Sequence, residues 1–266
     1  MPAPMNKFKA AITSGQLQIG FWQSLGTSIT SEICAYSGFD WLLIDGEHGP
    51  NDLRSIRDQL QMVGPSPSQA VVRISSVNVV EVKQVMDAGA QTVLVPIVDT
   101  AEDAELMARA MRYPPEGIRG NGAGVARASD YGRDAGYLTS ANDQACLLVQ
   151  AETKTALDNL EAICAVEGVD GVFIGPSDLA TSLGHHGDPG HADVQAAIED
   201  GITRIRAAGK APGILMADET KVRRYIELGA LFVAVGSDVA ILAQGSKGLA
   251  AKYLGGDAVS TKGQVY

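Results

Sequence analysis

Apolar residues in this chain gather into eight short runs, and the segments between them are mixed or polar. The runs contain many β-branched residues, and several have no polar position inside them. Continuous apolar runs are typical of strands that are covered on both faces, as the strands of a parallel sheet are. The predicted strands cover Ile19–Leu25, Trp41–Ile44, Ala70–Ile74, Thr92–Val98, Cys146–Val149, Gly171–Ile174, Gly213–Met216 and Phe232–Val235.

Between these runs, apolar residues recur every three or four positions, which is the period of a helix with one buried face. Strands that alternate with helices build a parallel sheet, and eight such units predict a (β/α)8 TIM barrel, an α/β fold. The alternative is an open doubly wound sheet, but no predicted strand is followed by the Gly-x-Gly-x-x-Gly turn that many such sheets carry. The predicted helices include 53–63, 79–85, 157–163 and 194–205.

The predicted barrel accounts for most of the chain. We expect a single domain over residues 1–254, followed by a polar tail over 255–266. The segment 111–142 is polar and glycine-rich, and it is too long for a plain connection between two elements. We predict that this segment is a functional loop after the fourth strand and that it closes over the site.

Composition narrows the class of protein. The chain has 266 residues, 45% of them hydrophobic and 20% charged, which is ordinary for a soluble globular protein. Its net charge of -10 argues against a nucleic acid or an anionic membrane as partner. No apolar run is long enough to span a membrane, and the N-terminus lacks the apolar stretch of a signal peptide. The three cysteines lack the spacing of a metal site, so we expect a cytoplasmic protein.

The chemistry of a TIM barrel lies at the carboxyl ends of its strands. Glu152 and Asp178 each follow a predicted strand, and two carboxylates suit an octahedral divalent cation that keeps other positions open for water and substrate. The alternative is that both residues cap helices. The backbone N–H groups of Ser177 and Asp178 begin a helix and suit a carboxylate. Further polar residues at strand ends are Asp45, Glu47, His48, Arg73, Asp99, Gln150, Asp218 and Asp238.

Arg73 and His48 are candidates for the charge and proton chemistry. Arg73 stands inside an apolar run, where it would bind a carboxylate or stabilise an enolate oxygen, or else form a structural ion pair. His48 follows two acidic residues and suits acid–base chemistry, although a lone loop histidine is often only a surface residue. Asp87 ends a predicted helix, where the dipole disfavours an acid, so either a specific partner or a plain surface position is open.

Three further histidines lie in one glycine-rich loop, at positions 185, 186 and 191. We expect them to be solvated, with metal binding by the loop left open. Lys83 and Lys154 lie outside the apolar strands, so neither has the surroundings of a Schiff-base lysine with a lowered pKa.

In combination, these motifs resemble the HpcH/HpaI aldolase family, the class II pyruvate aldolases. The matching stretches run in the family's order from about residue 5 to about residue 254 and each of them alone is modest. They are Asp45-Gly46-Glu47-His48, Arg73, Val95-Pro96-Ile97-Val98-Asp99-Thr100, Tyr113-Pro114-Pro115-Glu116-Gly117-Ile118-Arg119-Gly120, Gln150-Ala151-Glu152-Thr153-Lys154, Gly171-Val172-Phe173-Ile174-Gly175-Pro176-Ser177-Asp178-Leu179 and Val233-Ala234-Val235-Gly236-Ser237-Asp238.

The resemblance implies a role for each matching residue. It makes Glu152 and Asp178 the ligands of a divalent metal such as Mg²⁺, Mn²⁺ or Co²⁺. It makes Gln150 and Ser177 contacts of the substrate, together with Asp178 and Arg73. Arg73 is also the residue that stabilises the pyruvate enolate.

The resemblance further implies that His48 is the catalytic histidine and that Asp87 makes it more basic. The implied reaction is the reversible cleavage of 4-hydroxy-2-oxo acids to pyruvate and an aldehyde. The implied assembly is a homohexamer whose last helix packs on a neighbouring subunit. Two other functions stay open: a citramalyl- or malyl-CoA lyase, for which no basic cluster offers a CoA site, and a barrel that binds a metal and a 2-oxo acid without turnover.

Overall fold

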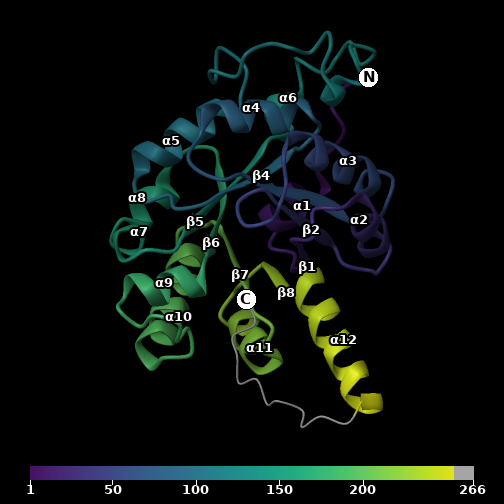
Figure 1. Cartoon of the computed structure of the whole chain (residues 1–266). Helices are drawn as coiled ribbons and strands as arrows, with labels where there is room; N and C mark the ends of the chain where they lie inside the picture. Colours follow the sequence, from purple (N-terminus) through teal and green to yellow (C-terminus); the bar gives the residue numbers. More distant parts are fainter. Residues whose placement is uncertain (255–266) are drawn as a thin grey trace.

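The computed structural model describes residues 1–254, so the predicted tail over 255–266 lies outside the described residues. Eight parallel strands close into a barrel in which each strand pairs with its neighbours in chain order and β8 pairs with β1 (Figure 1). The predicted TIM barrel is therefore confirmed. The strands are β1 Gln18–Gln23, β2 Trp41–Asp45, β3 Gln69–Arg73, β4 Thr92–Val95, β5 Cys146–Ala151, β6 Val169–Ile174, β7 Ala211–Leu215 and β8 Phe232–Ser237.

Helices surround the barrel, and most of them follow a strand directly (Figure 1). Within the described residues, no helix is both long and apolar enough to cross a membrane. The helices are α1 Lys7–Thr13, α2 Ser28–Ala35, α3 Leu53–Val63, α4 Val79–Asp87, α5 Ala101–Ala110, α6 Ala141–Gln144, α7 Lys154–Asp158, α8 Leu160–Ala165, α9 Pro176–Ser182, α10 Ala192–Ala207, α11 Glu219–Glu227 and α12 Asp238–Leu254, with a short 3-10 turn at Arg127–Ser129.

Several predicted elements differ from the observed ones by one to three residues at their ends, as β1 does, which ends at Gln23 and not at Leu25, and two differences bear on the site. The fourth strand was expected to reach Val98, but β4 ends at Val95 because the backbone turns at Ile97, whose φ is 50°. The helix expected over 157–163 is two helices, α7 and α8, which meet at Asn159. Asn159 turns its side chain to the carbonyl of Asp99 at 2.8 Å, so the side chain anchors the loop after β4 at this break.

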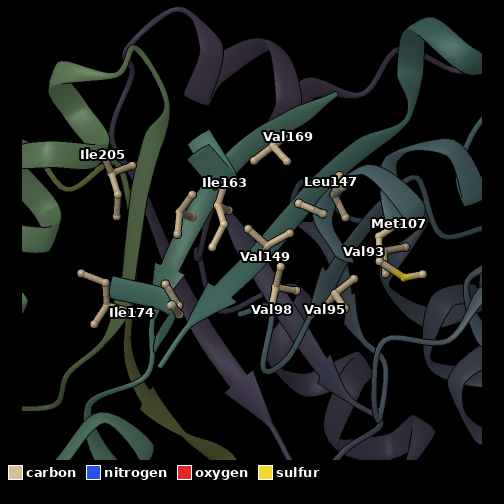
Figure 2. Close-up of a cluster of buried hydrophobic side chains, with 14 of the residues drawn as sticks. Val93, Val95, Val98, Met107, Leu147, Val149, Ile163, Val169, Ile174 and Ile205 are labelled. Carbon is tan, nitrogen blue, oxygen red and sulfur yellow. The ribbon is translucent and has the colours of Figure 1, made fainter. Parts of the chain in front are cut away.

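The core has two layers. Aliphatic side chains fill the space between the strands and the outer helices, as Figure 2 shows for Val93, Val149, Ile163 and Ile205. The inside of the barrel is filled by large rings, among them those of Trp41 and Phe232, which also meet Phe8 of α1. Helix α1 therefore plugs the amino end of the barrel.

Glycines make room for these rings. A Cβ atom on Gly20 would lie 2.1 Å from the ring of Trp41, and one on Gly213 would lie 2.1 Å from the ring of Phe232. Because real Cβ atoms do not approach other atoms so closely, both strands need glycine at these points.

The prediction that segment 111–142 closes over the site is wrong. The segment does not lie at the carboxyl ends of the strands. It connects the end of α5 to the start of β5, so it lies at the amino ends of the strands (Figure 1). There it is tied to the start of the chain, where the N–H of Ala3 donates to Ser140 Oγ at 2.8 Å. The prediction failed because it placed the segment by length, whereas a connection from a helix to the next strand reaches the opposite end of the barrel.

Candidate active site

Arg73 is the centre of a buried charge cluster at the carboxyl ends of β2, β3 and β5. Its guanidinium, 8% exposed, donates to both carboxylate oxygens of Asp45, at 2.9 and 2.7 Å. Nη1 lies 2.7 Å from Oε2 of Glu47, but without the geometry of a hydrogen bond, and 3.4 Å from the amide oxygen of Gln150. The guanidinium also lies over the Trp22 ring, 4.8 Å from its centre. The predicted structural ion pair exists, and it lies inside the predicted site.

Asp45 fixes the loop that carries His48. Its Oδ1 accepts hydrogen bonds from the backbone N–H groups of Glu47 and His48, at 3.0 and 3.2 Å. Burial raises the pKa of Asp45, but hydrogen bonds and charge from Arg73 outweigh it, so the pKa lies below its ordinary value. His48 itself is exposed, and its Nε2 lies 3.9 Å from Glu47. An exposed imidazole held by its backbone is free to meet a ligand.

Glu152 is 2% exposed at the end of β5, although it carries a carboxylate. Its Oε1 accepts the N–H of Ile97 at 2.9 Å, and its Oε2 accepts the amide Nε2 of Gln150 at 2.6 Å. Gly175, which precedes α9, leaves the space that Oε2 occupies, because a Cβ atom there would lie 2.2 Å from it. Three parts of the chain therefore shape the pocket of one carboxylate.

The surroundings of Glu152 disfavour its charged form. Burial raises its pKa to about 7, the N–H of Ile97 opposes that rise, and the charges of Asp178 and Glu47 add to it. Burial likewise raises the pKa of Glu47, against the positive charges of Arg73 and His48. The charge of Asp178 adds to the rise in pKa of both glutamates, so Asp178 lies near enough to share one cation with them.

The alternative in which Glu152 and Asp178 are helix caps is not what the structure shows. Thr153 caps α7, accepting the N–H of Ala156 at 3.0 Å. Helix α9 begins after Gly175 with Pro176 at its first turn and without a side-chain cap. Asp178 is exposed in that first turn, and Ser177 beside it is half-buried. Neither carboxylate is engaged in capping, so both are available to a ligand.

Asp87 lies away from this site in its own chain. It ends α4, five residues before β4 begins, and therefore lies at the amino ends of the strands. It pairs with Arg119 at 2.7 Å, and Arg119 in turn lies over the Tyr113 ring. The chain does not bring Asp87 to His48, but the specific partner considered for Asp87 exists.

The loop histidines form a cluster of their own. The rings of His185 and His191 are stacked, 3.6 Å between centres, and each lies within 3.7 Å of a carboxylate oxygen of Asp193. Nδ1 of His191 accepts the N–H of Asp193 at 3.2 Å and so caps α10. The ligand atoms of His185, His191 and Asp193 lie within 4.8 Å of one another, so a cation site at this loop stays open beside the cap. His186 takes no part in this cluster.

Sequence reasoning assigned no role to Asp45, Glu47 or Ile97. Asp45 and Glu47 were recognised only as polar residues at a strand end, and no sequence signal showed that they share the guanidinium of Arg73. In the sequence, Ile97 is part of an apolar run and was predicted only as a strand residue. Only its backbone, which turns an N–H group toward Glu152, shows that it belongs to the site.

Comparisons with known proteins identify the family of the chain. The family model for HpcH/HpaI aldolase/citrate lyase matches residues 18–244. The chain is 55% identical to a hydroxypyruvate/pyruvate aldolase of Pseudomonas aeruginosa, over 100% of both chains. It is 57% identical to a 4-hydroxy-2-oxo-heptane-1,7-dioate aldolase of Klebsiella pneumoniae, over 93% of this chain and 94% of the relative.

A solved structure extends the likeness to three dimensions. It is an HpcH/HpaI aldolase/citrate lyase family protein from Burkholderia cenocepacia J2315, 37% identical, with a TM-score of 0.90 over 93% of this chain and 99% of the other. A match over nearly the whole barrel, together with the charge cluster at its carboxyl end, leaves no other assignment: the chain belongs to the HpcH/HpaI aldolase/citrate lyase family and is an aldolase-type lyase.

Proposed function

We propose that the chain is a metal-dependent aldolase that cleaves 4-hydroxy-2-oxo acids to pyruvate and an aldehyde, and that also runs the reverse addition. The relatives named as aldolases of 4-hydroxy-2-oxo-heptane-1,7-dioate and of hydroxypyruvate and pyruvate support this substrate class. The observation that carries the proposal is the excess of negative charge around Glu152, which a divalent cation would balance.

The residues present fit such a cation. Glu47, Glu152 and Asp178 influence one another electrostatically, and Arg73, which counters the two glutamates, is already divided between Asp45 and Glu47. Oε2 of Glu47 is buried and lacks a hydrogen-bond donor. An all-oxygen donor set suits Mg²⁺, Mn²⁺ or Co²⁺, with Glu152 and Asp178 as the protein's ligands. When bound, the metal acts as a Lewis acid on the keto group of the substrate.

Arg73 is the proposed group that stabilises the negative charge that develops on the enolate oxygen. Its Nε and one Nη2 hydrogen are held by Asp45, and Nη1 faces Glu47 and Gln150, so the guanidinium plane is fixed before substrate arrives. A fixed guanidinium at a strand end can donate to the enolate oxygen through the Nη hydrogens that Asp45 does not hold, which costs no reorganisation during the reaction. Gln150, which donates to Glu152, and Ser177, which precedes Asp178, are the proposed contacts of the substrate's own carboxylate.

His48 is the proposed carrier of the proton between solvent, the C4 hydroxyl and the aldehyde oxygen. Cleavage removes the hydroxyl proton as the C3–C4 bond breaks, and addition returns a proton to the new alkoxide. The imidazole is exposed, and the backbone N–H of His48 donates to Asp45, so the ring is free to reach a bound ligand and bulk water alike.

We further propose that the protein assembles as a homohexamer in which α12 packs on a neighbouring subunit. Helix α12 projects from the barrel, and of its residues only Asp238 is buried (Figure 1). Its exposed apolar side chains include Ile241, Leu242 and Leu249, a face that water disfavours. In such an assembly Asp87 acts on His48 of another subunit, since its own His48 lies at the other end of the barrel.

The same proposal places the enzyme in the cytoplasm. Its three cysteines, Cys34, Cys146 and Cys164, are free thiols in the structure, as in a reducing compartment.

One pair of measurements tests the chemistry. Pyruvate release from a 4-hydroxy-2-oxo acid should stop after removal of metal with a strong chelator and return with added Mg²⁺, Mn²⁺ or Co²⁺. Borohydride added with pyruvate should leave the mass of the protein unchanged, because no lysine imine forms. Full activity in chelator together with a stable pyruvyl-lysine adduct would show a Schiff-base aldolase instead.

A further inference from the structure

Ile97 has a backbone conformation that its residue type disfavours. Its φ is 50°, in the left-handed region, where a β-branched side chain is a true outlier. In the described part of the chain, the other non-glycine residues with positive φ are Asp130 and Tyr131, neither of which is β-branched. The Ile97 side chain is 52% exposed, so it buries too little apolar surface to explain the conformation.

The turn is held by its neighbours. Pro96 is buried before it, and Val98 after it is buried completely. The N–H of Val98 donates to the carbonyl of Gln150 at 3.1 Å, and Asp99 accepts the hydroxyl of Thr153. The segment 97–99 is therefore attached to the segment 150–153, which contains Glu152. Strain of this kind persists only where the surroundings determine it, and it tends to concentrate at functional sites.

The consequence of the turn is a hydrogen bond. The N–H of Ile97 points at Oε1 of Glu152, at 2.9 Å, and no other donor reaches that oxygen within residues 1–254. Water cannot replace the bond easily, because Glu152 is 2% exposed. An extended backbone at Ile97 would turn the N–H away and leave the carboxylate held by Gln150 alone.

We propose that Ile97 is a positioning residue: its left-handed backbone aims its N–H at Glu152 and so holds the carboxylate in the orientation in which it would bind the cation. The proposal rests on the metal site proposed above. It assigns the role to the backbone N–H and not to the side chain, so a residue that accepts the left-handed region can replace isoleucine.

The direct test removes only the N–H. Nonsense suppression with 2-hydroxy-3-methylpentanoic acid replaces the amide before residue 97 by an ester and keeps the side chain. Titration with Mn²⁺, followed by electron paramagnetic resonance without substrate, should show binding about tenfold weaker than in the unmodified protein, as for other lost supports of metal ligands. Far-ultraviolet circular dichroism checks that the barrel is intact.

Ile97→Asn is the rescue variant, because asparagine tolerates the left-handed region and keeps its N–H. Its Mn²⁺ affinity should stay within about twofold of the unmodified protein, and relief of strain should raise its thermal midpoint by about 2 °C. Tyr131→Asn is the matched control, since Tyr131 is exposed, has a φ of 57° and lies in the segment at the other end of the barrel. It should gain stability without any change in Mn²⁺ affinity.

The outcomes separate the two proposals. If the ester protein binds Mn²⁺ as tightly as the unmodified protein, Ile97 does not position Glu152. If Ile97→Asn binds as weakly as the ester, the side chain matters and the backbone role is wrong. If the unmodified protein itself binds no Mn²⁺, the proposed metal site fails, and this inference fails with it.

Discussion

Glu152→Gln should make the metal-free protein more stable at pH 8, although it removes a proposed metal ligand. Burial raises the pKa of Glu152 from 4.5 to about 7. The folded protein therefore holds this proton more tightly than the unfolded chain does, and stability falls as the pH rises from about 4.5 to about 7. At about 1.4 kcal/mol for each pH unit, the ionised carboxylate costs about 3 kcal/mol above pH 7.

Glutamine has the same shape without the charge, so the variant should recover much of this cost. The recovery will be incomplete. If the new NH2 group takes the place of Oε2, it faces the Nε2 donor of Gln150, and the amide of Gln150 must then rotate. For a chain of this size, about 3 kcal/mol corresponds to roughly 6 °C as an upper limit on the gain in thermal midpoint. At pH 4.5 and below, Glu152 of the folded parent is neutral, so the gain should vanish and only the cost of rotating Gln150 should remain.

The assay is calorimetry in chelator at pH 4.5, 6, 7 and 8, at one protein concentration. Glu105→Gln, which removes the same charge from the exposed side of α5, is the control for net charge. A stability difference that is equal at every pH, or a variant less stable than the parent at pH 8, would refute the reasoning. Added Mg²⁺ should reverse the order, because it stabilises only the parent, by binding to the folded state.

Three further substitutions follow from the site. Arg73→Lys should lose at least about 100-fold in activity, because lysine cannot pair with both oxygens of Asp45. The variant should also fail to exchange the methyl protons of pyruvate for deuterium. Nuclear magnetic resonance follows this exchange, and a normal rate would contradict the enolate role of Arg73. Gly175→Ala should weaken Mn²⁺ binding about tenfold, because its methyl group would displace Glu152. His48→Ala should slow cleavage by about 100-fold or more, with partial recovery in imidazole, and unaffected cleavage would leave it a surface residue.

The fold was predictable because it depends on local patterns that repeat. Each strand of the barrel is covered on both faces, so its residues appear as an apolar run in the sequence, and all eight runs are strands. An apolar run predicts the wrong boundary where the run continues beyond the end of its strand. Thr92–Val98 is apolar nearly throughout, and only the backbone at Ile97 shows that β4 ends at Val95.

The segment 111–142 shows a second limit. Its length and composition were recognised correctly as unusual, but its position depends on connectivity. A loop that follows a helix returns to the amino ends of the strands, and there it holds Asp87 through Arg119. The sequence showed that Asp87 matches an acidic residue of the family. It did not show that Asp87 lies far from His48 of the same chain, because that depends on the direction of α4.

The chemistry of the site depends on how charge is shared, and residue identity alone does not determine that. Arg73 could have been free to bind an acid, but Asp45 engages it through two hydrogen bonds and Glu47 lies against it. One guanidinium so divided cannot also neutralise Glu152 and Asp178. In the proposed mechanism, a cation at this position offsets the local negative charge before an acidic substrate approaches. In that mechanism the carboxylates whose burial destabilises the metal-free barrel near neutral pH are the groups that would bind the metal, and the bound metal would attract the 2-oxo acid.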